Sequence, residues 1–517
     1  MQQPATKMSR FGLKCSQGYL ERILNARVYD VAIESPLHQA YGLSNRFGNT
    51  ILFKREDEQP VFSFKLRGAY NKMAQLTPQE LRHGVIAASA GNHAQGVALA
   101  AQRLGCKAVI VMPTTTPQIK VDAVQQRGAT IVLHGDSYSD AYAHARVLEA
   151  KEKLTLIHPY DDPEVIAGQG TIGMEILRQF NKPIDAIFIP IGGGGLAAGI
   201  AVYIKRLRPD IRIIGVEPVD SDAMKRSLLA RRRITLPHVG LFADGVAVKQ
   251  VGMETFRLCR HLIDEIVTVN TDEVCTAIKD GFEDTRAILE PAGALAIAGA
   301  KAYIERTRVR NKTFVVVTSG ANMNFDRLRF VAEVAEIGEA REAIIAFKIP
   351  ERPGSFKEFC RLIGNRPLTE FNYRYADDNE AHVFVGLQVR NHNETKELMQ
   401  IMRKSGITAI DLSDNHVAKL HIRHLVGGRA PNIKNEIVYR FEFPERPGAL
   451  LDFLNNLSCG WNITLFHYRN HGADIGRVLA GLQIPLEEKR EFEAVLKKLD
   501  YRFSEETDNM AYRLFLS

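Results

Sequence analysis

A short segment of this chain occurs twice, and that repeat limits the folds open to its last third more than any other feature. Three blocks return in the same order: residues 349–356 as 443–450, residues 371–374 as 466–469, and residues 385–389 as 480–484. The spacing is nearly constant, at 94, 95 and 95 residues, so duplication of one folding unit explains the pattern better than coincidence. Each copy predicts the order strand, Pro-Gly turn, helix, strand, strand, helix, strand, a small α+β unit of βαββαβ type.

Before the repeat, residues 82–322 alternate short apolar β-branched runs with stretches of helical periodicity. This alternation is typical of parallel strands joined by crossover helices. The expected strands are residues 85–88, 108–112, 131–134, 186–191, 211–216 and 314–318, and the expected helices include residues 93–104 and 163–180. Because the strands are apolar almost throughout, we expect helices on both faces of the sheet. The fold class is therefore α/β, followed by two α+β units.

The domain boundaries follow from these changes of pattern. At 517 residues the chain is too long for one core of ordinary size. We expect an α/β portion of two subdomains over residues 1–335, a charged connector at residues 336–341, and the repeated units at residues 342–415 and 437–509. A break containing Gly and Pro at residues 426–431 separates the two units.

Composition excludes several classes of function. The chain has 67 basic and 60 acidic residues and no basic run longer than Arg231 to Arg233, so we expect no nucleic-acid partner. Its six cysteines form no CxxC pair, which argues against a zinc knuckle or a disulfide framework and fits reduced cytoplasmic thiols. No stretch approaches the roughly 18 apolar residues of a membrane span, and the first thirty residues lack the apolar core of a signal peptide. We expect a soluble cytoplasmic protein.

One lysine has a setting suited to covalent chemistry. Lys65 lies among apolar residues and close to Gly68. If folding removes water from this amine, its pKa falls and the neutral form that a Schiff base requires becomes accessible near neutral pH. An isolated lysine is usually an exposed charge, so the prediction depends on the motifs that accompany it.

Two strand-to-helix turns could bind anions. Residues 89–92 should present backbone N–H groups at a helix N-terminus, which suits a substrate carboxylate. Four glycines at residues 192–195 occupy a similar place and would let the backbone wrap a phosphate. The alternatives are an ordinary turn capped by Asn92 and, for the glycines, a loop with no ligand or a dinucleotide-binding loop with Glu217 as its ribose-binding acid.

Polar residues also follow the last expected strand. Ser319 stands at its carboxyl end, where open α/β sheets bind ligands. We interpret the polar turns at residues 243–245 and 290–293 as structural, with substrate contact as the alternative. His93, at the start of an expected helix, is likewise interpreted as structural.

Taken in order, the motifs SFKLRGAY, SAGNHAQG, GGGGLAAG, EPAG and TSGAN closely resemble those of the threonine dehydratases, which depend on pyridoxal 5'-phosphate (PLP). The resemblance covers nearly the whole chain, because the duplicated tail is similar to the paired ACT-like regulatory domains of the biosynthetic form. It implies the tryptophan-synthase-β-like fold, type II among PLP enzymes, followed by two ACT-like domains. Five motifs in one order make it highly specific.

The resemblance implies a role for each motif. Lys65 would carry PLP as a Schiff base, Asn92 would bind its 3'-oxygen, and Ser319 would face its pyridine nitrogen. The phosphate loop would consist of Gly192, Gly193, Gly194, Gly195 and Leu196. The substrate carboxylate would lie against Ser89, Ala90, Gly91 and Asn92. A neutral hydroxyl at Ser319 need not keep the ring protonated, which favours β-elimination over transamination.

The implied reaction is β-elimination of L-threonine to 2-oxobutanoate and ammonia, and of L-serine to pyruvate, as the first step of isoleucine biosynthesis. Threonine would displace Lys65 from the cofactor, and the freed amine would act as the base at Cα. Isoleucine would inhibit through the ACT-like pair, valine would counteract it, and the chain would form a homotetramer. Some relatives hold a divalent cation through two acids six residues apart; here Glu217 is followed by Ala223, so we expect no metal site.

Two other functions remain open from the sequence alone. The glycine loop could belong to an NAD-dependent oxidoreductase, although Lys65, Asn92 and Ser319 would then have no role. The chain could also be a non-catalytic amino-acid sensor in which only the tail acts. A cofactor absorption band that borohydride bleaches, with label on Lys65, would separate the three functions.

Overall fold

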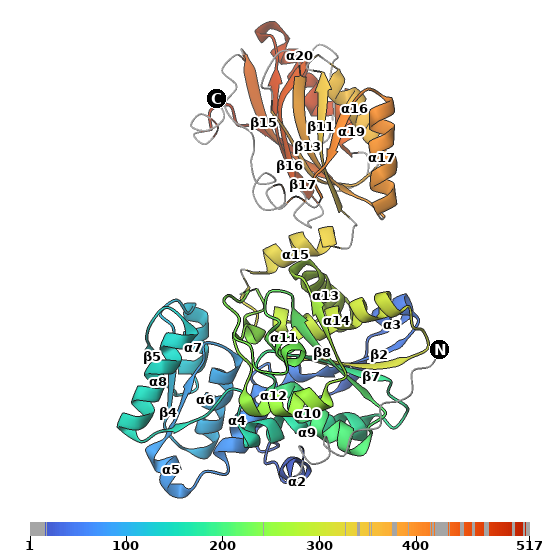
Figure 1. Ribbon diagram of the computed structural model, residues 1–517. Helices are drawn as coiled ribbons and strands as arrows, with labels where there is room; N and C mark the ends of the chain where they lie inside the picture. Colours follow the sequence, from blue (N-terminus) through green and yellow to red (C-terminus); the bar gives the residue numbers. More distant parts are fainter. Residues whose placement is uncertain are drawn as a thin grey trace. The chain divides into compact units, whose positions relative to one another are not determined.

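The computed structural model describes residues 16 and 18–338, apart from 241 and 326, and most of residues 342–512. Within 342–512 it leaves undescribed residues 351, 353, 365, 375–379, 391, 414, 416–417, 419–432, 434, 445–448, 457–460, 470–474, 499–501 and 510–511. The chain divides into two compact units, Met1–Ala335 and Glu336–Ser517. The first unit contains two mainly parallel sheets and the second a single antiparallel sheet (Figure 1).

A six-stranded sheet forms the larger subdomain of the first unit, in the order β1-β2-β10-β7-β8-β9. Its strands are β1 (Leu37–Gln39), β2 (Thr50–Arg55), β7 (Ala186–Pro190), β8 (Arg212–Pro218), β9 (Glu265–Val269) and β10 (Thr313–Thr318). β1 is antiparallel to β2, and the other neighbouring pairs are parallel. The central strands are buried along almost their whole length, as their apolar sequences predict.

Helices cover both faces of this sheet. α9 (Pro163–Gln179) and α10 (Gly195–Leu207) pack on the face that carries Ile187 and Val315. α13 (Thr271–Thr285) and α14 (Pro291–Thr307) pack on the face that carries Phe188 and Phe314. Smaller elements complete the subdomain: α2 (Tyr19–Leu24), α3 (Tyr41–Phe47), η1 (Glu56–Glu58), α11 (Ala223–Ala230), η2 (Asp244–Val246), α12 (Met253–Leu262) and the first part of α15 (Arg327–Gly338).

A four-stranded parallel sheet forms the smaller subdomain, in the order β5-β4-β3-β6. Its strands are β3 (Val85–Ala88), β4 (Ala108–Met112), β5 (Thr130–Leu133) and β6 (Thr155–Leu156). Its helices are α4 (Lys65–Met73), α5 (Pro78–His83), α6 (Asn92–Leu104), α7 (Gln118–Gln125) and α8 (Tyr138–Glu152), of which α6, α7 and α8 surround the sheet in Figure 1. α4 links the subdomains because it packs against both α6 and α9.

The α/β fold class is confirmed, and the expected elements differ from the observed ones mainly at their ends. β5 spans residues 130–133 instead of 131–134, and β8 spans 212–218 instead of 211–216. The sequence did not predict β2, because its apolar run Ile51–Phe53 is short and is followed at once by charged residues. The charged residues, Lys54 and Arg55, are buried and paired with acidic side chains. A sequence pattern that treats charged residues as exposed cannot reveal such a strand.

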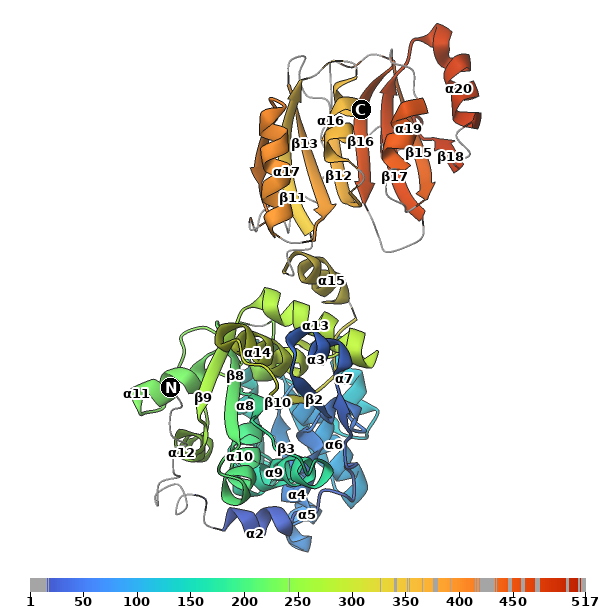
Figure 2. The ribbon, with the colours of Figure 1, turned by 90° about the vertical axis from the view of Figure 1, so that its right-hand side faces the viewer.

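The second unit contains both predicted βαββαβ copies. The first copy is β11 (Glu342–Pro350), α16 (Ser355–Ile363), β12 (Leu368–Arg374), β13 (Glu380–Gln388), α17 (His392–Lys404) and β14 (Thr408–Asp411). The second copy is β15 (Glu436–Pro444), α19 (Ala449–Asn456), β16 (Asn462–Arg469), β17 (Ile475–Gln483), η4 (Leu486–Glu488), α20 (Lys489–Lys498) and β18 (Arg502–Glu505). Together they form one eight-stranded sheet, in the order β14-β11-β13-β12-β16-β17-β15-β18 (Figure 2).

The repeated Phe-x-Tyr-Arg block forms the seam between the copies. β12 pairs with β16 in antiparallel fashion, with Phe371 opposite Tyr468 and Tyr373 opposite Phe466. The ring of Phe356 on α16 lies 5.4 Å from that of Phe466 in the other copy. One apolar core runs through both copies, so the pair packs as a single body.

Some predicted features fall on or near undescribed residues. Residues 336–338 of the expected connector are the last turn of α15, and residues 339–341 lie outside the described residues. In the first Pro-Gly turn, Gly354 has a φ of 91° and precedes α16. The second turn, at residues 445–448, and the break at residues 426–431 lie outside the described residues. Among the helices that the structure describes, none is both long and apolar enough to cross a membrane.

Candidate active site

Parallel strands bring three predicted site segments to one edge of the larger sheet. β2, β10 and β7 are neighbours and run in the same direction, so their carboxyl ends lie side by side. Ser319 follows β10, Gly192 follows β7, and the chain after β2 leads through η1 to Lys65. The backbone N–H of Phe64 donates to the carbonyl of Ser319 at 3.3 Å, which brings Lys65 beside that serine. Open α/β sheets bind ligands at this edge.

Lys65 is the first residue of α4 and is only partly exposed. Its Nζ donates to the carbonyl oxygen of Pro159 at 2.9 Å. Burial lowers the pKa of the Lys65 amine to about 8, and the charge of Glu290 opposes this shift. A neutral amine is therefore accessible near neutral pH, as the apolar neighbours of Lys65 predict.

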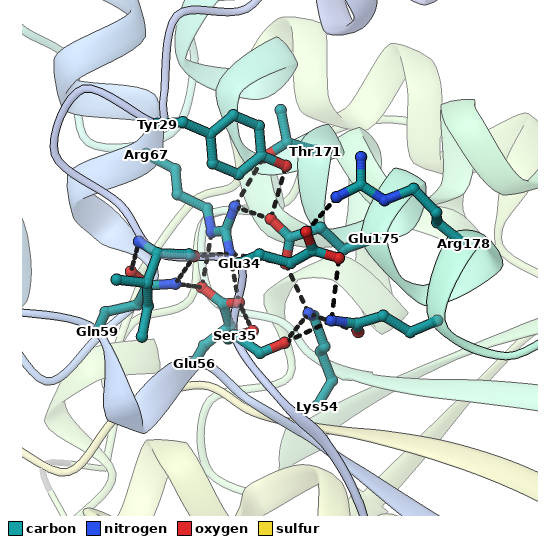
Figure 3. A network of polar contacts seen from close by, with 12 residues as sticks. Tyr29, Glu34, Ser35, Lys54, Glu56, Gln59, Arg67, Thr171, Glu175 and Arg178 are labelled. Atoms are coloured by element: carbon teal, nitrogen blue, oxygen red, sulfur yellow. Dashed lines mark hydrogen bonds and ion pairs between the residues drawn. The ribbon is translucent and has the colours of Figure 1, made fainter.

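Two residues further along α4, Arg67 ties this helix to its surroundings (Figure 3). Its Nε lies 2.8 Å from Oε2 of Glu56 in η1, and its Nη1 lies 2.6 Å from Oε1 of Glu175 in α9. Lys54 of β2 also contacts Glu175 at 2.6 Å, and all four side chains are fully buried. Because two cations meet two carboxylates, the buried charges balance. The cluster joins the start of α4 to both β2 and α9, and so supports the position of Lys65.

The glycine run has the form of an anion-binding loop. β7 ends at Pro190 and α10 begins at Gly195, so residues 192–194 lie at the positive end of the α10 dipole. Gly194 has a φ of 97°, which side chains rarely permit, and a Cβ on Gly193 would come within 2.2 Å of the Tyr160 ring. The loop therefore presents backbone N–H groups without side chains, which fits a phosphate.

The turn from Ser89 to Asn92 lies close to the start of α4. Gly91 precedes α6, and its backbone N–H donates to Ser89 Oγ at 3.2 Å. α6 and α4 approach so closely that a Cβ on Gly96 would come 3.0 Å from the backbone nitrogen of Leu66. Apart from Gly91 itself and its two chain neighbours, no atom of the described residues lies within 4 Å of the place of a Cβ on Gly91, so the turn has free space on this side.

Two neighbours fix the orientation of the Asn92 side-chain amide. Its Nδ2 donates to Glu290 Oε1 at 2.6 Å, and its Oδ1 accepts from Asn322 Nδ2 at 2.6 Å. An amide nitrogen carries two hydrogens, so one remains to donate to a ligand. Burial, together with the charge of Asp244, raises the pKa of Glu290 to about 7. Glu290, which the sequence suggested to be structural, thus contacts a predicted site residue directly.

Polar side chains close in sequence to Lys65 and Asn92, together with Ser319, also fit a bound PLP molecule. Ser319 is 3% exposed and its Oγ donates to the carbonyl of Ala292 at 3.2 Å, so it supplies a neutral hydroxyl. Ser63 Oγ and His93 Nδ1 are buried and have no hydrogen-bond partner among the described residues. Buried polar atoms normally have partners, so these two favour a polar ligand. A desolvated amine, a phosphate loop, an amide donor and a hydroxyl are the groups that an aromatic aldehyde phosphate requires.

Glu217 argues against the dinucleotide-binding alternative. Its side chain is fully buried at the end of β8 and accepts from the backbone N–H groups of Met224 and Lys225, each at 2.8 Å. It therefore holds the first turn of α11 and is not free to bind a ribose. Within the part of the chain that the structure describes, no three His, Cys, Asp or Glu side chains gather as a metal site would require.

The comparisons with known proteins agree with this site. A family model for pyridoxal-phosphate-dependent enzymes matches residues 28–320, and the C-terminal regulatory domain of threonine dehydratase matches residues 333–422 and again 427–516. The fold and site thus define a PLP-dependent enzyme with a duplicated regulatory tail.

Relatives that match this chain along nearly its full length narrow the class of PLP-dependent enzymes to one family. The chain is 59% identical to the biosynthetic L-threonine dehydratase of Burkholderia multivorans, over 97% of this chain and 100% of that protein. It is 52% identical to the Escherichia coli enzyme, over 96% of this chain and 97% of that one. The processed form of threonine deaminase isoform 2 from Solanum lycopersicum is 54% identical, with a TM-score of 0.61 over 64% of this chain and 96% of that chain. The chain belongs to the biosynthetic threonine dehydratase family.

The protein is accordingly a PLP-dependent lyase that converts L-threonine into 2-oxobutanoate and ammonia. The oxidoreductase and sensor alternatives are wrong, because the family shown is neither of them. The sequence did not single out Pro159 or Tyr160, which contact Lys65 and the glycine loop, or Arg67, which holds α4 through Glu56 and Glu175. Only the Pro-Tyr-Asp-Asp run at residues 159–162, between β6 and α9, offered a signal for the first two.

Proposed function

We propose that Lys65 carries the cofactor covalently through Nζ and acts as the base at Cα of threonine once the substrate has taken its place. The observation that carries this proposal is the place of Lys65 at the start of α4, beside Ser319, where burial lowers the pKa of its amine to about 8. An amine with that pKa can take up and release a proton near neutral pH. The carbonyl of Pro159, 2.9 Å away, gives the amine a fixed direction.

The cofactor would be held by the other predicted residues. The phosphate would be bound by backbone N–H groups of the loop formed by Gly192, Gly193, Gly194, Gly195 and Leu196. Asn92 would donate its remaining amide hydrogen to the 3'-oxygen, and Ser319 would face the pyridine nitrogen. When bound, PLP supplies an electron sink for the charge that develops at Cα. Because the Ser319 hydroxyl is neutral, it adds no fixed charge that would keep the ring protonated, and this favours loss of the β-hydroxyl.

The substrate carboxylate lies against the turn formed by Ser89, Ala90, Gly91 and Asn92. This turn sits at the N-terminus of α6, where the helix dipole and free N–H groups favour an anion. L-serine should fit the same site, since a missing methyl group changes specificity only about 10- to 200-fold. Serine would then give pyruvate.

Borohydride reduction tests the assignment of Lys65. The reagent should fix the mass of the cofactor onto Lys65 and bleach its absorption band. Peptide mass spectrometry of the reduced full-length enzyme locates the label. Label on another lysine, with Lys65 unmodified, would contradict the proposal.

The paired units carry the regulation that we propose. Isoleucine binds the pair at residues 342–415 and 437–509 and inhibits, and valine counteracts it. Support comes from the single core that runs through both copies, because a ligand bound to either copy acts on one packed body. Each effector must favour a different arrangement of the chain to have opposite effects. The enzyme would act in the cytoplasm as a homotetramer. Sedimentation velocity would test the number of chains in the assembly.

A further inference from the structure

Residues 158–161 form a short strap between β6 and α9 that is closed by its own histidine. His158 Nδ1 accepts the backbone N–H of Asp161 at 2.8 Å and that of Tyr160 at 3.3 Å. Burial lowers the pKa of His158, so its ring is neutral and Nδ1 can accept both bonds. The strap is therefore a defined turn and not a free connection.

Three of the contacts that leave this strap reach the start of α4, the glycine loop and the start of α12. The Pro159 carbonyl accepts from Lys65 Nζ at 2.9 Å. The Tyr160 ring fills the space where Gly193 would carry a Cβ. The Asp161 carboxylate accepts the backbone N–H groups of Met253, Glu254 and Thr255, at 2.8, 2.9 and 3.1 Å.

The contact to α12 closes a ring of interactions. Asp161 caps α12, whose preceding Gly252 has no room for a side chain because a Cβ would lie 2.2 Å from Asp161 Oδ1. Thr255, in the first turn of α12, donates through Oγ1 to the Gly193 carbonyl at 2.7 Å. The same helix start thus holds both the strap and the glycine loop.

We propose that Asp161 is a positioning residue for Lys65. By fixing the strap to the start of α12, it holds the Pro159 carbonyl where it accepts from the Lys65 amine and holds Tyr160 against the glycine loop. When one hydrogen of the amine is held by a fixed acceptor, the rest of the amine nitrogen has a defined direction. A base needs such a defined direction to reach one particular proton of the substrate. The inference rests on the proposed role of Lys65.

The test compares full-length Asp161→Ala with Asn270→Ala. Asn270 caps α13 through the backbone N–H of Glu273 and contacts none of the site residues named above. Both variants lose a side chain that caps a helix, so both urea midpoints should fall, and that of Asp161→Ala should fall further because Asp161 accepts three backbone N–H groups and Asn270 accepts one. Two further quantities separate them: the dissociation constant of PLP for the apoenzyme, and kcat and KM for L-threonine at saturating PLP.

Asp161→Ala should weaken PLP binding about 10-fold and lower kcat roughly 10- to 100-fold with little change in KM, because the base is misplaced after substrate has bound. Asn270→Ala should leave these values within about 2-fold. If Asp161→Ala does not fold, Asp161→Asn takes its place, with smaller changes in the same direction because its amide oxygen can still accept. An unchanged kcat at saturating PLP, for whichever variant folds, overturns the proposal. Absence of borohydride label on Lys65 in the wild-type enzyme would instead overturn the proposed function.

Discussion

Burial shifts the pKa values of Lys65 and Glu290 toward each other. Loss of water lowers the pKa of the Lys65 amine to about 8 and raises that of the Glu290 carboxyl to about 7. Both groups can therefore change protonation state within about one pH unit of neutrality, whereas in water their pKa values lie far apart. Glu290 in turn sets the direction of the Asn92 amide.

Replacing Glu290 with Gln should change how stability depends on pH. The carboxyl has a pKa of 4.5 in the unfolded chain and about 7 in the folded one, so between these values the folded state holds more protons. Stability should therefore fall as pH rises from about 4.5 to about 7, by up to about 3 kcal/mol, and Glu290→Gln should lack this part of the slope. Urea unfolding at pH 4.5 and pH 7.5 measures it. Equal slopes in the two proteins would contradict the assignment.

Lys65, Asn92 and Ser319 could be identified as candidates from the sequence, because each lies in a short motif whose neighbouring residues indicate a chemical role. Glu290 and Pro159 could not be assigned in the same way. Glu290 meets Asn92 across 198 positions, and Pro159 meets Lys65 across 94. Contacts of that separation depend on how the two subdomains pack, which no local pattern specifies.

At the scale of elements, the buried cluster around Arg67 holds α4 in place. Lys54 lies on a strand that the sequence failed to predict, and Glu175 lies on a helix that it predicted well. Charged residues are almost never fully buried unless they are paired, so nothing in the sequence indicated this cluster. Lys54, Glu56 and Glu175 come from β2, η1 and α9 of the larger subdomain, and Arg67 joins them from α4 of the smaller one.

Replacing Glu175 with Gln should destabilise the protein strongly. Lys54 and Arg67 would keep their charges with only Glu56 to balance them, and an uncompensated buried charge usually costs about 3–5 kcal/mol. Denaturant unfolding measures the loss. Glu34→Gln is the matched control, because Glu34 pairs with Arg178 at the surface and should cost at most about 1 kcal/mol. Equal losses would show that the cluster does not act as a buried charge network.

At the scale of the whole molecule, the sequence revealed the duplication but not the single sheet that results from it. The repeat predicted two βαββαβ copies, and both are present. The two copies join because β12 of the first pairs with β16 of the second. Nothing in the sequence of the repeated block indicates which strand it pairs with. The aromatic residues of that block pack across the seam.

Truncation tests whether the second unit carries the regulation. The cut should follow Gly338, because Val331, Val334 and Ala335 of α15 pack in the core of the first unit. Residues 1–338 should dehydrate L-threonine without inhibition by isoleucine, whereas residues 1–330 should lose stability because those apolar side chains are missing. Initial rates with and without isoleucine, and thermal melting, measure both effects. Inhibition that persists in residues 1–338 would contradict the proposed location.

Formation of 2-oxobutanoate from L-threonine tests the central claim most directly. The comparison uses wild type, Lys65→Ala and Lys72→Ala, where Lys72 is another lysine of α4 whose Nζ pairs with the Asp162 carboxylate and not with the Pro159 carbonyl. Lys65→Ala should lose roughly 10³-fold or more of the rate, because it lacks both the cofactor's anchor and the base. Lys72→Ala should keep a rate close to that of wild type. A wild-type rate in Lys65→Ala would contradict the account.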